Sequence, residues 1–223
     1  MIYCLVKRRL FLYLIKLCHY DIIIIMIVVD IEASGVDYNK HSIVSIGAID
    51  FHNPTNRFYE ECKIWDGAHI EDDSMKVNGF TKEEITDPTK KTEAEIVREF
   101  IEWAKGIEDF TMAGQNVSFD RDFLQAGARR GHLDWPFAHR VIDVHTLAYM
   151  HMVKRGITPP LKNNHTALSL DVELKYVGIP EEPKPHNALT GALSHTEVIS
   201  RLLYNKPLLD EFKDYPMPDF NDK

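Results

Sequence analysis

The sequence predicts an α/β fold in which a mixed central β-sheet is flanked by helices. Residues 22–32 form an apolar, β-branched run that is typical of a central strand buried on both faces. Residues 43–51 and 58–65 have the composition of two further strands separated by a turn, which indicates an antiparallel meander. From residue 92 onward, helical and strand patterns alternate, as they do in sheets that contain parallel strands.

The helices of this fold have recognisable start signals. Thr81-Lys-Glu-Glu84 and Thr92-Glu-Ala-Glu95 both match the capping box, in which a hydroxyl is followed three residues later by Glu. The second pattern opens a clearly amphipathic helix that we expect to end near Gly106. The remaining expected elements are strands at 110–114 and 141–145, helices at 120–128, 146–152, 169–177 and 187–204, and a polar loop at 156–166.

The chain length suits one domain with short extensions. We expect the domain to span residues 26–205 of the 223, because Met26-Ile-Val-Val-Asp30 would open the first strand directly. Residues 1–25 are apolar but interrupted by basic residues, and we hypothesise that they are an upstream extension that is not part of the native protein. They contain no uninterrupted apolar run of the ~20 residues that a membrane span needs. The tail, residues 206–223, is expected to be peripheral or loosely ordered, and the alternative is that it is a docking segment.

Charge and cysteine content limit the partners. A net charge of −8 argues against wrapping nucleic acid over a broad basic face. It leaves room for a nucleic-acid enzyme, because bound divalent cations can supply positive charge locally. The scattered Cys4, Cys18 and Cys62 support neither a disulfide framework nor a zinc site, so a cytoplasmic location is expected.

Chemistry-bearing residues stand at three places. Asp30 and Glu32 are two apart at the end of the first strand, so they project to the same side and repel unless a proton or cation lies between them. Asp120 stands where a strand and loop lead into a helix, where it could be simply a helix cap. His186 precedes the last helix and, taken alone, could be an ordinary surface histidine.

The order and context of these residues carry a resemblance. The matching stretches are Val28-Val-Asp-Ile-Glu-Ala-Ser-Gly35, Ala113-Gly-Gln-Asn-Val-Ser-Phe-Asp120, Ser169-Leu-Asp-Val-Glu-Leu-Lys-Tyr-Val-Gly-Ile179 and His186-Asn-Ala-Leu-Thr-Gly-Ala192. Over about residues 26–204 the chain resembles the DEDDh 3′→5′ exonuclease superfamily, which includes the proofreading subunit of the bacterial replicative DNA polymerase. The resemblance implies a ribonuclease-H-like fold and a single-stranded 3′ end as substrate.

The resemblance also implies a two-metal mechanism with Mg²⁺ or Mn²⁺. By analogy Asp30 bridges both ions, Glu32 favours the ion on the side of the nucleophile, and Asp120 favours the leaving-group side. His186 takes the proton from the attacking water, and the product is a nucleoside 5′-monophosphate. The residues implied to shape the pocket for the terminal nucleotide are Ala33, Ser34, Gly35, Asn116 and Phe119.

One position departs from the family pattern. The superfamily places a fourth acidic ligand, an Asp, five residues after the histidine, and this chain has Gly191 there. Losing that ligand should weaken the nucleophile-side ion most and lower activity by orders of magnitude. Three explanations stay open: a natural relative of low or no activity, a deliberately inactivated variant, and a sequence error.

Two functions therefore compete. The first is a metal-dependent 3′→5′ exonuclease, impaired to some degree by Gly191; the alternative is a catalytically inactive nucleic-acid-binding or interaction domain of the same fold. Retention of Asp30, Glu32, Asp120 and His186 favours the enzyme. The sequence does not distinguish DNA from RNA, although we favour single-stranded DNA, nor a polymerase-associated proofreading subunit from a free-standing exonuclease.

Overall fold

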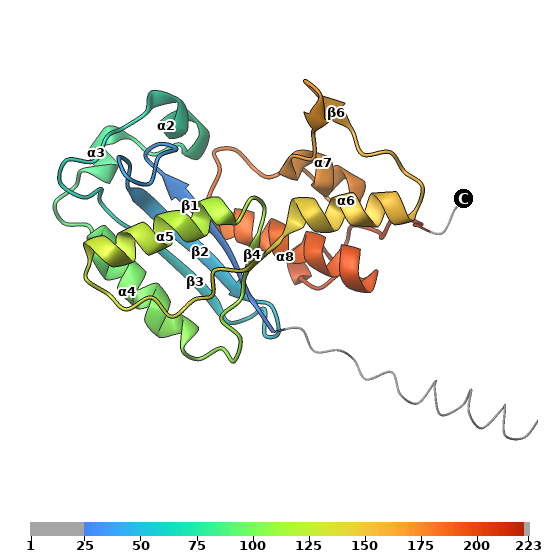
Figure 1. Ribbon diagram of the computed structural model, residues 1–223, viewed down its shortest axis with the longest axis horizontal. Helices are drawn as coiled ribbons and strands as arrows, with labels where there is room; N and C mark the ends of the chain where they lie inside the picture. Colours follow the sequence, from blue (N-terminus) through green and yellow to red (C-terminus); the bar gives the residue numbers. More distant parts are fainter. Residues whose placement is uncertain (1–24, 221–223) are drawn as a thin grey trace, which may run out of the picture.

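A computed structural model of the chain describes residues 25–220 and contains a five-stranded sheet in the order β3-β2-β1-β4-β5 (Figure 1). The central strand, β1 (Ile27–Ala33), pairs antiparallel with β2 (Ile43–Asp50), which pairs antiparallel with β3 (Arg57–Glu61). On its other edge β1 runs parallel to β4 (Met112–Gly114), and β4 runs parallel to β5 (Val141–Asp143). The expected mixed sheet and its meander are confirmed.

Alternate residues of β1, and Met26 just before it, belong to two separate cores, which explains why this stretch is continuously apolar. Ile27, Val29 and Ile31 lie in the core formed with α4 and α5, whereas Met26 and Val28 lie in the core formed with α6, α7 and α8. In Figure 1 the last three helices are grouped to the right of the strands. The helices are α2 (Asp72–Asn78), α3 (Lys82–Ile85), α4 (Glu93–Ala104), α5 (Ser118–Arg130), α6 (Val144–Lys154), α7 (Leu170–Tyr176) and α8 (Ala188–Tyr204).

Both capping boxes are present as expected. The Thr81 side chain accepts from the Glu84 backbone N–H, and the Thr92 side chain accepts from that of Glu95 at 3.3 Å. In each case the Glu side chain accepts in return from the backbone N–H of the threonine, at 2.7 Å. These reciprocal bonds satisfy N–H groups that a helix start leaves unpaired, so the local sequence sets where α3 and α4 begin.

Several elements differ from the sequence-based expectations. The third strand ends at Glu61, earlier than the expected residue 65, and α2 was not expected. The polar loop at 156–166 contains a small hairpin, β6 (Leu161–Lys162) and β7 (His165–Thr166). Its turn residues Asn163 and Asn164 both have positive φ angles, 52° and 63°, as a two-residue hairpin turn requires.

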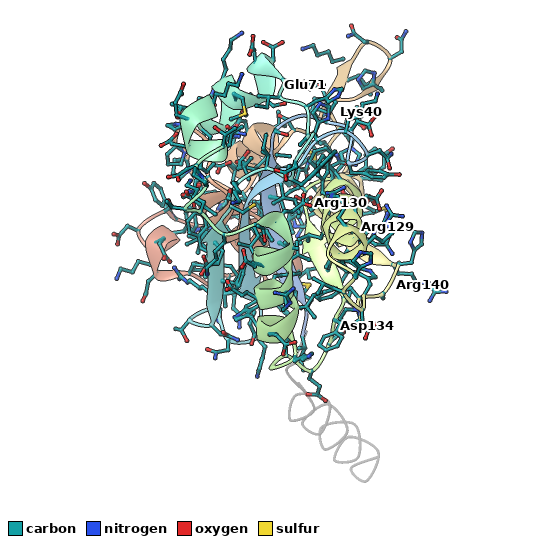
Figure 2. The ribbon with its side chains drawn as sticks, turned by 90° about the vertical axis from the view of Figure 1, so that its left-hand side faces the viewer. Lys40, Glu71, Arg129, Arg130, Asp134 and Arg140 are labelled. Carbon is teal, nitrogen blue, oxygen red and sulfur yellow. The ribbon has the colours of Figure 1, made fainter. Side chains whose placement is uncertain are left out.

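A buried ion pair joins the start of α4 to the end of α5. The Glu93 carboxylate is 2% exposed and accepts from Arg130 Nε at 2.7 Å and from Arg130 Nη2 at 2.8 Å. It also accepts from the Ser42 hydroxyl and from the Ile43 backbone N–H. Arg130 is labelled at the end of α5 in Figure 2. This pair holds both helices against the start of β2, on the face of the sheet away from α8.

The C-terminal segment is fixed to the domain, and the expectation of a loosely ordered tail is wrong for residues 206–220. Arg201 of α8 is fully buried and donates to the carbonyl oxygens of Phe212 and Tyr215, at 3.1 Å and 2.9 Å. Its Nε donates to Glu197 Oε1 at 2.6 Å, and Glu197 Oε2 accepts from the backbone N–H groups of Leu208 and Leu209. The tail includes a short 3₁₀ helix, η1 (Asp210–Phe212).

Two further expectations concern the rest of the chain. The proposed extension, residues 1–25, lies outside the described residues except for Ile25, so it stays a hypothesis. Within residues 25–220, no helix is both long enough and apolar enough to cross a membrane.

Candidate active site

The C-terminal half of β1 carries Asp30 and Glu32 on the side of the sheet that faces α8. They continue the alternation of Met26 and Val28, which pack against that layer, and α8 lies against β1 and β2. Gly191 of α8 lies directly against Asp30: a Cβ built on Gly191 would overlap the Asp30 carboxylate. The fold thus brings the strand carboxylates to the helix position where the superfamily pattern has its fourth acid.

Asp120 lies in the first turn of α5 and is 3% exposed. Its Oδ1 accepts a hydrogen bond from the backbone N–H of Ile31 at 3.0 Å, so its carboxylate is held between the strand positions of Asp30 and Glu32. The interpretation of Asp120 as a helix N-cap is wrong, because the N-cap of α5 is Val117. A buried Asp that is bonded to the strand is positioned for chemistry at the strand.

The loop between α7 and α8 supplies His186. Its backbone N–H donates to the carbonyl oxygen of Val77 at 3.0 Å, which ties the loop to the end of α2. Its side chain is 35% exposed, and Nδ1 lies 3.9 Å from Glu182 Oε2. Asn78, at the end of α2, donates to the carbonyl oxygen of Ala33 at 3.1 Å, so the loop is held near the C-terminal end of β1, as can be followed in Figure 1. His186 is therefore at the border between the acidic side chains and solvent.

Glu182 is a residue of this site that sequence reasoning missed. It is 7% exposed, and its Oε1 accepts from the Thr190 hydroxyl at 2.7 Å. Its charge raises the pKa values of both Asp30 and Glu32. A signal was present in the sequence: a Glu lies four residues before the histidine. Without a helix or strand to define its direction, however, that spacing does not reveal where the side chain points.

The carboxyl groups repel one another in a poorly hydrated environment. Burial, followed by the charges of Asp120, Glu32 and Glu182, raises the pKa of Asp30 well above its usual range. Burial and then the charge of Glu182 raise the pKa of Glu32 to about 8. Burial also raises the pKa of Asp120, to about 7, against the opposing effect of the Ile31 hydrogen bond. Protons or cations must therefore neutralise this site near neutral pH.

The donor set fits a hard divalent cation. Carboxylate oxygens are the ligands that Mg²⁺ and Mn²⁺ favour. Within residues 25–220, Asp30, Glu32 and Asp120 form no ion pair with a lysine or arginine, so a cation would meet no competing positive charge. In the same residues, no three His, Cys, Asp or Glu side chains already surround a common ion position. Binding would therefore require small side-chain adjustments.

The pocket residues at the end of β1 have structural contacts of their own. Ala33 and Ser34 are buried, and the Ser34 hydroxyl donates to the carbonyl oxygen of His69 at 2.7 Å. The space that Gly35 leaves open is filled by the imidazole of His41, since a Cβ built there would overlap that ring. A role for these three residues in nucleotide binding stays a prediction.

The two pocket residues after β4 lie closer to solvent. Asn116 is exposed and has a φ of 51°, a left-handed conformation that Asn tolerates well. Phe119 is partly buried and packs on Phe123, with ring centroids 4.7 Å apart. Phe119 and Asp120 are adjacent in the first turn of α5, so this end of the helix borders the acidic side chains. Contact with a nucleotide is likewise a prediction for both residues.

Glu173 of α7 is a further buried acid, and the charge of Asp143, at the end of β5, acts on it. It is fully buried, and neither of its carboxylate oxygens accepts a hydrogen bond that meets normal geometry within the described residues. Burial, and then the charge of Asp143, raise the pKa of Glu173 to about 8. The neutral acid is thus the favoured form in the folded protein, and ionising it costs stability.

Glu173→Gln is expected to stabilise the protein much more at pH 8 than at pH 5. In the parent, a folded-state pKa near 8 against an ordinary one near 4.5 means that stability is lost as pH rises through this window. Glutamine cannot ionise, so the gain in unfolding free energy should be roughly 3–4 kcal/mol larger at pH 8 than at pH 5. Urea unfolding at both pH values measures it, with the exposed Glu181→Gln as control. An equal effect of Glu173→Gln at both pH values would contradict the raised pKa.

A mixed five-stranded sheet with acidic side chains gathered at the end of its central strand defines a ribonuclease-H-like nuclease domain. A family model described as Exonuclease matches residues 27–198. The chain therefore belongs to the exonuclease family, and the resemblance seen in the sequence motifs is confirmed at the level of family and fold.

Solved structures agree on the fold. The nuclease domain of 3′hExo, a DEDDh family member bound to rAMP, is 18% identical with a TM-score of 0.62, and the match covers 84% of this chain and 94% of that one. E. coli exonuclease I in complex with a 5cy-dT13 oligonucleotide is 16% identical with a TM-score of 0.64, over 81% of this chain. The chain spans 41% of the length of exonuclease I.

Proposed function

We propose that the protein is a divalent-metal-dependent 3′→5′ exonuclease that releases nucleoside 5′-monophosphates from single-stranded nucleic acid. The observation that carries the proposal is the meeting of Asp30, Glu32 and Asp120 at one end of β1, without a basic partner in the described chain. His186 borders this group from a loop that is fixed to α2. Membership in the exonuclease family supports the same conclusion.

Asp30, Glu32 and Asp120 would hold Mg²⁺ or Mn²⁺, two ions by analogy with the superfamily. Bound ions would polarise the scissile phosphate and promote formation of the nucleophile. His186 would accept the proton of the attacking water at a ring nitrogen. Because the side chain is partly exposed, it could then release that proton to solvent. Asp120, held by the Ile31 N–H, would keep its carboxylate oriented throughout.

The nature of the substrate is a further part of the proposal. We favour single-stranded DNA, and exonuclease I is a neighbour that carries a dT13 oligonucleotide. The neighbour 3′hExo carries rAMP, so RNA is a substrate to be compared directly. We also propose that the protein associates with a DNA polymerase subunit and that it is cytoplasmic. Copurification would test the association, and cell fractionation would test the location.

The test is digestion of matched single-stranded DNA and RNA oligonucleotides, each labelled at its 5′ end, in Mn²⁺. The proposal predicts a ladder of labelled products that shortens from the 3′ end, with no digestion in EDTA. A DNA circle, which has no ends, should stay intact under the same conditions. Internal cleavage of the circle, or early release of the labelled 5′ nucleotide, would contradict the proposed direction.

The alternative of an inactive nucleic-acid-binding domain is favoured by one observation, the absence of a side chain at Gly191. It predicts that the protein binds single-stranded ends without shortening them in Mg²⁺ or Mn²⁺. A filter-binding measurement on the same oligonucleotides distinguishes the two functions. Binding without digestion, at enzyme concentrations above that of the substrate, would favour the alternative.

Added Mn²⁺ is expected to stabilise the protein by relieving repulsion among the carboxyl groups. With the pKa of Glu32 raised to about 8 and that of Asp120 to about 7, stability without metal falls as pH rises toward 8. A ligand at 100 times its Kd adds about 2.7 kcal/mol, which raises Tm by several degrees. Thermal unfolding with Mn²⁺ and with EDTA measures the shift, which should be larger at pH 8 than at pH 6. Identical Tm values in Mn²⁺ and EDTA at pH 8 would contradict metal binding at this site.

A further inference from the structure

We propose that Glu182 supplies the fourth carboxylate of the metal site and takes the place of the acidic side chain that is missing at Gly191. The inference rests on the proposed function and assigns a metal ligand that the superfamily pattern does not contain. It also gives Gly191 a role in a rearranged site, in which the acid comes from a loop and not from the helix.

The position of Glu182 is set by the residue next to Gly191. Thr190 is in the first turn of α8, and its hydroxyl donates to Glu182 Oε1 at 2.7 Å. The Glu182 carboxylate is therefore bonded to the residue that directly precedes Gly191, the position to which the superfamily pattern assigns the missing Asp. The start of α8 is itself fixed, because the Asn187 side chain accepts from the N–H groups of Leu189 and Thr190.

The space at Gly191 explains why the acid cannot come from the helix in this arrangement. A Cβ at this position would overlap the Asp30 carboxylate, so Asp30 occupies the volume that a side chain at 191 would need. With Asp30 packed against the helix backbone, a fourth carboxylate has to approach from another direction. The loop before His186 provides that approach through Glu182.

A purely structural role does not account for the surroundings of Glu182. The side chain is 4% exposed, yet its polar partners in the described chain are the neutral Thr190 hydroxyl and His186, whose Nδ1 is 3.9 Å away and beyond hydrogen-bonding distance. Burying a carboxylate beside Asp30 and Glu32 costs free energy unless a cation compensates it. A bound divalent ion would supply that compensation to all of these carboxylates at once.

Mn²⁺ binding measured by titration calorimetry on the full chain tests the inference without relying on activity. Glu182→Gln is expected to weaken Mn²⁺ binding by at least about 10–100-fold, the loss that already follows when a hydrogen-bonding partner of a metal ligand is removed. Glu181→Gln makes the same charge change at an exposed neighbouring residue and should bind as the parent does. Circular dichroism and Tm of each variant verify that it is folded.

Restoring Mn²⁺ affinity with a second substitution distinguishes a metal ligand from a residue that only contributes to packing. Gly191→Asp combined with Glu182→Gln should recover Mn²⁺ affinity to within a few-fold of the parent, once the Asp30 side chain rotates away from the helix. Thr190→Val, which removes the hydroxyl that holds Glu182, should weaken binding to a lesser extent than Glu182→Gln does.

The outcomes separate this inference from the proposed function. If Glu182→Gln binds Mn²⁺ like the parent while Asp30→Asn loses binding, Glu182 is not a ligand although the site is real. If Glu182→Gln loses binding and Gly191→Asp does not restore it, replacement of the fourth acid is likewise refuted. A parent that neither binds Mn²⁺ nor digests nucleic acid overturns the proposed function and the inference together.

Discussion

Asp30→Asn is expected to lower nuclease activity by roughly a thousandfold or more while leaving the domain folded. Asp30 lies between Glu32, Asp120 and the backbone of α8, so it is the carboxylate with the most neighbours at the proposed ion positions. Asparagine has nearly the same shape but lacks the charge that would bind the ions. The rate of shortening of a 5′-labelled oligonucleotide in Mn²⁺ measures the loss.

The same substitution should raise the stability of the metal-free protein at pH 8. Burial and neighbouring carboxylates raise the pKa of Asp30, so its ionisation opposes folding as pH rises, and asparagine cannot ionise. Tm in EDTA should increase by a few degrees. Asp134→Asn, at an exposed position beyond the far end of α5, is the control and should change neither property. A variant that loses activity and stability together would indicate misfolding and not a catalytic role.

Arg201→Met is expected to destabilise the protein by about 3–5 kcal/mol. The guanidinium group is fully buried, pairs with Glu197 and donates to carbonyl oxygens of the tail, so its removal leaves a buried carboxylate and several acceptors unpaired. Urea unfolding measures the change. Because these bonds hold residues 206–220, the tail should also become more accessible to protease.

The matched control for this variant is Arg98→Met, which removes an exposed arginine of α4 and should cost no more than about 0.5 kcal/mol. A loss of less than 1 kcal/mol for Arg201→Met would contradict the role assigned to the buried pair. If the tail of Arg201→Met is no more sensitive to protease than that of the parent, the bonds from Arg201 to the tail carbonyls do not hold the tail, and the loss of stability comes from the unpaired Glu197.

Sequence patterns predicted the elements whose residues repeat regularly or carry local signals. The β-branched run up to Asp30 predicted a strand buried on both faces, and Thr92 with Glu95 marked the start of α4. The tail was judged by its prolines and charges, but its order comes from Arg201, whose partners lie up to 24 residues away in sequence. Interactions of that kind have no local pattern.

The residues of the candidate site likewise divide into those that a local sequence pattern predicts and those that depend on contacts between distant segments. Asp30 and Glu32 could be placed on one side because strand periodicity fixes their relative direction. Asp120 needed the motif context, since its sequence position alone suggested a helix cap, and its bond to Ile31 joins elements 89 residues apart. Glu182 lies on an irregular loop, where spacing does not define direction. Only the folded chain shows that its carboxylate meets Thr190 at the start of α8.

Analysis of the reaction products in ¹⁸O-labelled water tests the central claim most directly. Single-stranded DNA with a free 3′ end would be digested in Mn²⁺ by the parent and by Asp30→Asn, and the products identified by mass spectrometry. The account predicts nucleoside 5′-monophosphates that carry one ¹⁸O atom on phosphate and an oligonucleotide that ends in an unlabelled 3′-hydroxyl, with product formation dependent on Asp30. Intact substrate, a labelled 3′-phosphate, or equal digestion by both proteins would contradict it.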